Sequence, residues 1–347
     1  MLKIAIVNDS IMAAESLRRI VESVPGYRLV WVAYDGREAL QKCADLCPDI
    51  ILMDLIMPEM DGIEATRAIC AQYQCAILVV TASVGGHTGK VFEAMGAGAL
   101  DAVNTPVLGV DGKGEGADML IAKIRTIATL LRGKTEARFD STIVSRPPMS
   151  DGPPLIAIGA STGGPSALCE VLGALPPDPG VAIVIIQHVD EQFAAGLTRW
   201  LDDQVALKVR AARPGEPLAL NTALVCARED HLVLGPDGRL DYTPEPTSLV
   251  YRPSVDVFFS SVANNYKNQV IGVLLTGMGK DGAAGLKALR DLNWCTIAQD
   301  EASCAVYGMP KAAKELQAAS EILSLVNIGP RLAEWAEQAA LIRSPTT

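Results

Sequence analysis

The first part of the chain alternates between short apolar runs and longer amphipathic stretches. The apolar runs are KIAIV from Lys3, YRLVWVA from Tyr27, DIILM from Asp49, AILVV from Ala76 and ALDAV from Ala99. Apolar runs of about four to eight residues between segments of helical period are typical of buried parallel strands. We therefore predict an α/β domain over residues 1–132, in which five strands and their helices form a doubly wound sheet.

The periodicity stops at residues 133–152, GKTEARFDSTIVSRPPMSDG, where Arg, Ser, Pro and Gly accumulate. This composition is typical of an exposed linker. From Leu155 the alternation resumes with the apolar runs LIAIG, VAIVIIQ, VIGVLLTG and CTIAQ, and with a hairpin pattern around LVLGPDGRLDY. We predict a second α/β domain with a mostly parallel sheet over residues 153–343.

Composition supports this division and excludes some functions. A chain of 347 residues is long for one hydrophobic core, and 49% hydrophobic with only 5% aromatic residues suits α/β layers. The net charge of −10, without a Lys/Arg-rich run, argues against nucleic acid as a partner.

The compartment can also be predicted from the sequence. No apolar stretch approaches the roughly 20 residues that span a bilayer, and polar residues interrupt the N-terminus too early for a signal peptide. The eight cysteines lie in apolar segments and form no CxxC pair, so we expect reduced thiols. We predict a cytoplasmic protein without membrane insertion.

Candidate chemistry follows the strands of the second domain, because functional side chains of open α/β sheets gather beyond the carboxyl ends of the strands. Ser161 follows LIAI within GASTG, a match to the short GxSxG nucleophile pattern. His188 follows VAIVIIQ, and Asp281 follows VIGVLL. These are the residue types of a nucleophile, a base and an orienting carboxylate. His231 precedes a strand, so we place it at the opposite edge of the sheet.

Two other interpretations are open at this point. Ser161 or Thr162 could simply cap the next helix. Gly277, Gly279 and Gly282 also spell GxGxxG, with Asp300 about 20 residues further on, as in a dinucleotide-dependent dehydrogenase. Against the dehydrogenase, Asp281 inside that loop would repel a pyrophosphate.

The second domain resembles the catalytic domain of the CheB family, the chemotaxis-type protein-glutamate methylesterases. The resemblance rests on IGASTGG, IIQHV, RPSVDVFF, LLTGMGKDGAAG and TIAQDEASCAVYGMP, between about residues 155 and 340. It implies that Ser161 is the nucleophile, His188 the general base and Asp281 the orienting acid, and that the Met278 amide contributes to the oxyanion hole.

The implied reaction is hydrolysis of glutamyl methyl esters on a methylated chemoreceptor-like protein, without a cofactor. Some members of the family also deamidate receptor glutamines. A different class of function remains open, a non-catalytic adaptor of a receptor–kinase array, whose second domain binds receptors or the kinase without turnover.

In the first domain, polar residues follow three strands. Asn8 and Asp9 follow KIAIV, Asp54 follows DIILM, and Thr81 follows AILVV. Carboxylates at adjacent strand ends suit Mg²⁺, with Asp54 accepting a phosphoryl group, whereas the plainer use of Asp9 and Asp54 is to cap the next helices.

The segment MDLIMPEMDGIEATR at 53–67 and IVND at the start resemble the receiver domains of two-component response regulators. The resemblance implies phosphorylation of Asp54 by a CheA-type histidine kinase, Mg²⁺ held by Asp9 and Asp54, and contact of Thr81 with the phosphoryl group. Asn8 replaces one acid of the usual pair, and Thr105 stands where receivers usually have lysine. With these two residues, the stretches IVND and NTP resemble the methylesterase of the Wsp surface-sensing pathway more than the enzyme of swimming chemotaxis.

Overall fold

The computed structural model describes residues 1–81, 84–108, 114–130, 152–249 and 251–343. The chain divides into two compact units, Met1–Lys134 and Thr135–Thr347. Apart from Gly152, the predicted linker 133–152 lies outside the described residues, so its limits stay a prediction. Each unit is described by itself.

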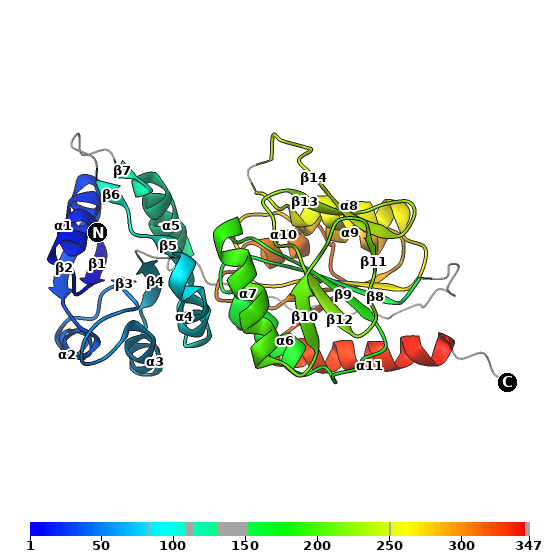
Figure 1. Cartoon of the computed structure of the whole chain (residues 1–347), viewed down its shortest axis with the longest axis horizontal. Coiled ribbons are helices and arrows are strands. Elements are labelled where there is room, and N and C mark those ends of the chain that lie inside the picture. Colours follow the sequence, from blue (N-terminus) through cyan, green and yellow to red (C-terminus); the bar gives the residue numbers. More distant parts are fainter. Residues whose placement is uncertain (82–83, 109–113, 131–151, 250, 344–347) are drawn as a thin grey trace. The chain divides into compact units, whose positions relative to one another are not determined.

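The first unit contains a five-stranded parallel sheet with strand order β2-β1-β3-β4-β5 (Figure 1). Its strands are β1 (Leu2–Val7), β2 (Tyr27–Ala33), β3 (Ile50–Met53), β4 (Ala76–Thr81) and β5 (Asp101–Asn104). All residues of β3 and β4 are buried, because helices cover both faces of the sheet. The predicted doubly wound α/β fold is confirmed.

Five helices surround this sheet: α1 (Ile11–Ser23), α2 (Gly36–Asp45), α3 (Gly62–Gln72), α4 (Val84–Gly96) and α5 (Ala117–Leu130). Helices α1 and α5 lie on one face, and α2, α3 and α4 lie on the other (Figure 1). A two-stranded ladder, β6 (Val107–Leu108) with β7 (Gly114–Glu115), precedes α5.

The second unit contains a seven-stranded sheet with strand order β10-β12-β9-β8-β15-β16-β17. Every neighbouring pair in it is parallel. Its strands are β8 (Leu155–Ala160), β9 (Ala182–Gln187), β10 (Lys208–Ala211), β12 (Thr222–Val225), β15 (Val270–Leu274), β16 (Cys295–Gln299) and β17 (Glu321–Leu323). The strand order reverses at β8, with β9 on one side and β15 on the other, and ligands bind open α/β sheets at such a switch point.

The helices of this unit are α6 (Gly164–Gly173), α7 (Glu191–Gln204), α8 (Val255–Asn265), α9 (Ala283–Asp291), α10 (Met309–Glu315) and α11 (Leu325–Arg343). Helices α6, α7 and α11 cover one face of the sheet, and α8, α9 and α10 cover the other (Figure 1). Fully buried Phe258, Leu274 and Leu286 belong to the core between α8, α9 and β15.

A small antiparallel sheet packs beside α8, with strand order β11-β14-β13. It comprises β11 (Glu216–Pro217), β13 (His231–Leu234) and β14 (Arg239–Thr243). The β13–β14 pair confirms the predicted hairpin. Ser261 of α8 accepts a hydrogen bond from the Leu234 amide at 2.9 Å, which fixes β13 against that helix.

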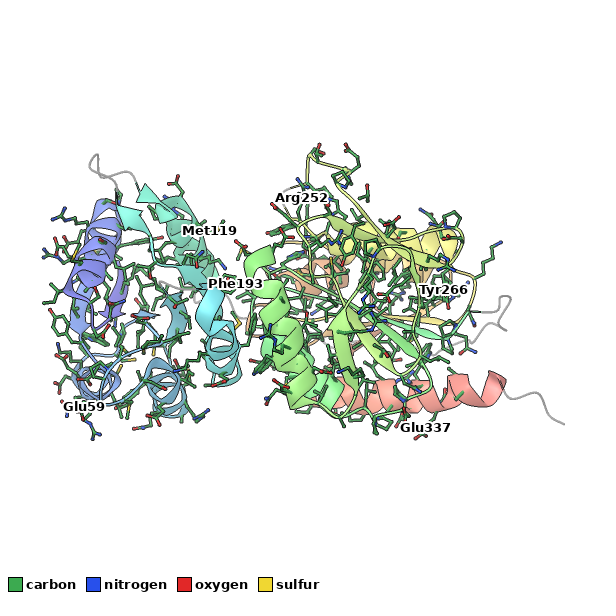
Figure 2. The ribbon with its side chains drawn as sticks, viewed as in Figure 1. Glu59, Met119, Phe193, Arg252, Tyr266 and Glu337 are labelled. Carbon is green, nitrogen blue, oxygen red and sulfur yellow. The ribbon has the colours of Figure 1, made fainter. Side chains whose placement is uncertain are left out.

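Side chains fill the space between sheet and helices in both units (Figure 2). Tyr266, labelled in Figure 2, ends α8 and is 7% exposed. All eight cysteines are free thiols. In the part of the chain that the structure describes, no helix has the length and apolar character needed to cross a membrane.

Candidate active site

The turn after β8 presents Ser161 at the switch point of the sheet. Its amide donates to the Thr276 carbonyl at 3.0 Å, and its own carbonyl accepts from Gln187 Nε2 at 2.8 Å. In the GxSxG elbow the strained residue is the serine itself, but here the left-handed residue is Gly163, with φ of +76°. The turn therefore resembles that elbow in placement, not in backbone conformation.

His188 directly follows β9. Its amide donates to the Ala160 carbonyl at 3.0 Å, which continues the β8–β9 pairing by one step toward the serine. The imidazole stacks on the ring of Tyr251, with centroids 4.6 Å apart and planes inclined by 3°. Backbone pairing and ring stacking thus fix the position of His188.

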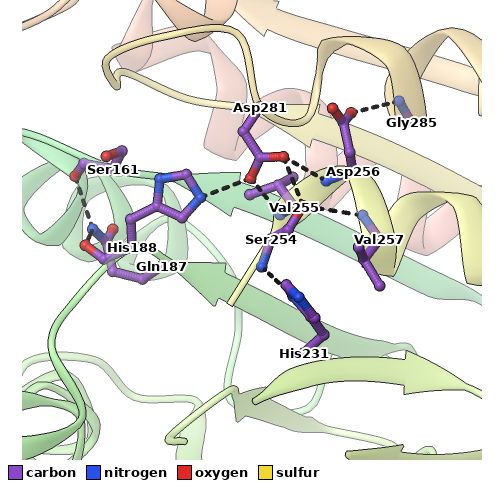
Figure 3. Close-up of polar contacts among 10 residues, drawn as sticks. All are labelled: Ser161, Gln187, His188, His231, Ser254, Val255, Asp256, Val257, Asp281 and Gly285. Carbon is purple, nitrogen blue, oxygen red and sulfur yellow. Dashed lines mark hydrogen bonds and ion pairs between the residues drawn. The ribbon is translucent and has the colours of Figure 1, made fainter. Parts of the chain in front are cut away.

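Asp281 lies in the loop between β15 and α9, and its carboxylate is bound from two sides. His188 Nε2 lies 2.8 Å from Oδ2 (Figure 3). From α8, Ser254 Oγ donates to Oδ1 at 2.7 Å and the Val255 amide to Oδ2 at 2.6 Å. The first turn of α8 thereby supplies the donors that a buried carboxylate requires.

These contacts determine the ionisation of Asp281, which is 8% exposed. Burial alone would raise the pKa of the carboxyl, but hydrogen bonds and the charge of His188, together with bonds from Ser254 and Val255, outweigh it and lower the pKa. Asp281 is therefore ionised at neutral pH and accepts the hydrogen bond from His188 Nε2.

The two ring nitrogens of His188 have different environments. Nε2 donates to Asp281, whereas Nδ1 is buried without a partner among the described residues and lies on the side of Ser161 (Figure 3). In chymotrypsin-like proteases Nδ1 faces the acid and Nε2 the serine, so the nitrogens have exchanged roles. Bonds between serine and base are often long before substrate binds.

The residues around Ser161 also determine where an oxyanion could bind. Among the described residues no hydrogen bond uses the Thr162 amide, and the amide after the nucleophile commonly serves as an oxyanion donor. Thr276 Oγ1 donates to the Thr162 carbonyl at 3.0 Å and accepts from the Val306 amide at 2.8 Å. The sequence did not indicate Thr162 or Thr276 in these roles, and Met278 as an oxyanion donor stays a prediction.

The glycines of the 277–282 loop are packed against the protein's own atoms. A Cβ on Gly277 would lie 2.6 Å from the Ser161 Cβ, and one on Gly279 would lie 2.7 Å from the Tyr251 hydroxyl. A Cβ on Gly282 would meet a Leu274 methyl at 2.5 Å. These glycines bring the loop close to the serine, so the dehydrogenase interpretation loses its main support.

The predicted position of His231 is wrong. The imidazole is fully buried, and Nδ1 accepts a hydrogen bond from the Ser254 amide at 3.0 Å (Figure 3). The prediction failed because β13 belongs to the small antiparallel sheet and not to the main one. His231 therefore lies behind Asp281, on the far side of Ser254.

In the first unit, Asp9, Asp54 and Thr81 lie at the carboxyl ends of the adjacent strands β1, β3 and β4. The plainer interpretation of the two acids is wrong, because other residues cap the helices. Ser10 caps α1, and Asp61 caps α3.

The carboxylate of Asp54 is destabilised where it lies. Burial raises its pKa, and the nearby negative charge of Asp9 raises it further, against the lowering effect of the Leu55 and Ile56 amides. Two carboxylates that repel each other fit a hard divalent cation, and Mg²⁺ often binds through one or two carboxylates plus phosphoryl oxygens and waters. Thr81 is 2% exposed, and its carbonyl accepts from the Thr105 amide at 2.9 Å.

Fold and site together define a serine hydrolase with a response-regulator receiver domain at its N-terminus. Residues 156–332 match the family model of the CheB methylesterase, and residues 4–109 match that of the response regulator receiver domain. The chain belongs to the CheB methylesterase family.

Similar proteins extend over nearly the whole chain. A protein-glutamate methylesterase/protein-glutamine glutaminase of Cupriavidus metallidurans is 52% identical over 95% of this chain and 97% of its own length. One of Pseudomonas aeruginosa is 51% identical over 96% of this chain and 99% of its own. The crystal structure of the Thermotoga maritima CheB catalytic domain is 32% identical and covers 54% of this chain and all of that one, with a TM-score of 0.50.

Proposed function

We propose that the protein hydrolyses glutamyl methyl esters of a chemoreceptor-like signalling protein, with Ser161 as nucleophile. The observation that carries this proposal is the position of His188, which is bound to Asp281 through Nε2 and whose Nδ1, on the side of Ser161, has no hydrogen-bond partner among the described residues. The names of the similar proteins support the substrate class.

In the first half of the reaction, the Ser161 hydroxyl gives its proton to His188 Nδ1 while Oγ attacks the ester carbonyl carbon. The resulting imidazolium is stabilised by Asp281. When the tetrahedral intermediate collapses, the carbon–methoxy bond breaks and the proton passes from Nδ1 to the leaving oxygen, which gives methanol and a glutamyl ester of Ser161.

In the second half, water gives a proton to Nδ1 and its oxygen attacks the acyl-enzyme. The bond to Ser161 Oγ then breaks, Oγ takes the proton back, and glutamate is released. An amide substrate follows the same route with ammonia as leaving group, so the site also supports deamidation of receptor glutamines.

The negative charge on the tetrahedral oxygen needs donors. We assign the amides of Thr162 and Met278 to this role, since both belong to the segments that meet at Ser161. One such donor is worth about 3 kcal/mol of transition-state stabilisation in comparable sites.

Methanol release from a methylated receptor preparation tests this function. We expect release by the full chain and none above background by Ser161→Ala. If the wild-type chain releases no methanol from a substrate verified with another methylesterase, the chain functions as a non-catalytic adaptor and the proposal is wrong.

Phosphorylation of the receiver is the regulatory input that we propose, with a CheA-type histidine kinase of the cytoplasm as phosphodonor. Asp54 would accept the phosphoryl group, Asp9 and Asp54 would hold Mg²⁺, and Thr81 would contact the phosphoryl oxygens. Mg²⁺ supplies charge neutralisation for the transferred group. Since Asn8 removes a carboxylate from the usual receiver set, we expect weak Mg²⁺ binding. Thr105 removes the cation that would balance the charge of the acyl phosphate.

The same two variants support placement in the Wsp branch, where the receptor's kinase controls a diguanylate cyclase. A deletion strain should then contain more cyclic diguanylate than its parent. Unchanged levels would contradict the placement in the Wsp branch.

A further inference from the structure

The orienting acid of the triad depends on a helix end that belongs to a different segment of the chain. Three donors from the start of α8 bind the Asp281 carboxylate: Ser254 Oγ at 2.7 Å, the Val255 amide at 2.6 Å and the Asp256 amide at 3.2 Å. The position of the first turn of α8 therefore determines how accurately the Asp281 carboxylate is oriented toward His188.

Ser254 is the point at which that first turn is fixed. It is 1% exposed, and its Oγ accepts from the Val257 amide at 3.3 Å while donating to Asp281. Its own amide precedes the helix and donates to Nδ1 of His231. The bond to His231 therefore ties the helix start to the strand β13.

The hydrogen-bond partners of His231 select one tautomer of its ring. Since Nδ1 accepts from the Ser254 amide at 3.0 Å, it carries no proton. Nε2 then carries the proton and donates to the Pro246 carbonyl at 3.4 Å. A proton on Nδ1 would oppose the Ser254 N–H in a fully buried position, so the Nε2–H tautomer is the one that fits these hydrogen bonds.

We propose that His231 is a positioning residue of the esterase. Through Nδ1 it fixes Ser254, and through Ser254 it places the donors that orient Asp281 toward His188. Figure 3 shows this series of hydrogen bonds, from His231 through Ser254 to Asp281 and His188. The proposal rests on the esterase function, because its effect is on the general base of that reaction.

Loss of the Nδ1 acceptor would leave a buried amide donor without a partner, and the segment before α8 would shift to find one. Displacement of Asp281 relative to His188 would lower kcat, since orientation errors of about 1 Å can cost as much as a hundredfold in rate. KM should change little, because His231 is buried behind the triad and does not face the substrate.

A pair of isosteric variants tests this in the full chain. His231→Asn places an amide oxygen near the position of Nδ1, whereas His231→Leu has the same branched shape without an acceptor, and both lose the bond to Pro246. In methanol release we expect His231→Leu to lose about tenfold or more in kcat at similar KM. His231→Asn should stay within about threefold of wild type.

A double substitution distinguishes positioning from general destabilisation. If His231 acts through Ser254, the double variant His231→Leu/Ser254→Ala should lose no more kcat than the more impaired single variant. Equal kcat for His231→Leu and His231→Asn, or losses that multiply, would overturn the proposal.

Two controls make the result decisive. Wild type and Ser161→Ala are measured in parallel, because a wild type without activity would refute the esterase function and not this inference. If His231→Leu does not fold, Ser254→Ala decides, with a loss of about tenfold in kcat at unchanged KM expected and wild-type kcat contradicting the proposal.

Discussion

At the scale of single residues, the surroundings of Asp281 and Asp54 shift the pKa values of the two carboxyls in opposite directions. Asp281 receives donors from His188 and the start of α8, and its pKa is lowered despite burial. Asp54 is half-buried, and burial together with the negative charge of Asp9 raises its pKa. One carboxylate is thereby stabilised as an anion, and the other is destabilised until a cation or a phosphoryl group arrives.

The raised pKa of Asp54 has a consequence for stability. A carboxyl whose folded-state pKa exceeds its unfolded value destabilises the fold above that pKa, and this penalty disappears as pH falls below the ordinary value of about 3.9. Asp54→Asn should therefore raise the thermal midpoint of the full chain at pH 7. The difference should vanish near pH 3.5, about the unfolded-state pKa.

Differential scanning calorimetry with and without Mg²⁺ measures this effect. Mg²⁺ should raise the wild-type midpoint and leave Asp54→Asn unchanged, because the cation neutralises the same charge. Asp45→Asn, at the exposed end of α2, is the matched control and should behave as wild type. A lower midpoint for Asp54→Asn at pH 7 would contradict the electrostatic account.

At the scale of elements, catalysis depends on two loops that approach each other from β8 and β15. Gly277 makes this approach possible, because a Cβ there would lie 2.3 Å from Met309 Sδ and 2.6 Å from the Ser161 Cβ. Gly277→Ala should therefore displace the serine turn and lower kcat by about a hundredfold.

Gly173→Ala is the control for this substitution, because nothing lies within 4 Å of its Cβ position. At the end of α6 alanine should be neutral or slightly stabilising. Methanol release and circular dichroism on both variants separate a local from a global effect. Full activity of Gly277→Ala would show that the two loops need not be so close.

Much of this arrangement could be predicted from the order of strands and helices. Ser161, His188 and Asp281 each follow a long apolar run, and parallel strands bring their carboxyl ends to one edge.

Ser254, Thr276 and His231 could not be found in this way, because their roles depend on hydrogen bonds between segments 23 to 114 residues apart. The short strands β10, β12 and β17 carry little periodicity, and only pairing with their neighbours defines them.

At the scale of the whole molecule, one chain joins a receiver domain to a methylesterase domain. If the receiver holds the esterase closed in a ratio of 99 to 1, inversion of that ratio by phosphorylation requires about 5.5 kcal/mol of differential stabilisation. Without a lysine at the position of Thr105, we expect a phosphoryl group to supply only part of this energy.

Comparison of the full chain with the fragment 153–347 measures the restraint. The fragment should release methanol up to about 100-fold faster, and a small acyl-phosphate donor should activate the full chain less than that. Asp54→Ala should abolish the response to the donor. Equal rates for wild type and Asp54→Ala, before and after the donor, would show that phosphorylation does not control the esterase.

The central claim is that the glutamyl group passes through an ester of Ser161. Rapid acid quenching of the full chain with a methylated receptor peptide, followed by mass spectrometry of the digested enzyme, tests it directly. We expect an adduct on Ser161 with the mass of the peptide less methanol, absent in Ser161→Ala. Methanol release by Ser161→Ala at the wild-type rate, or an adduct on another residue, would contradict it.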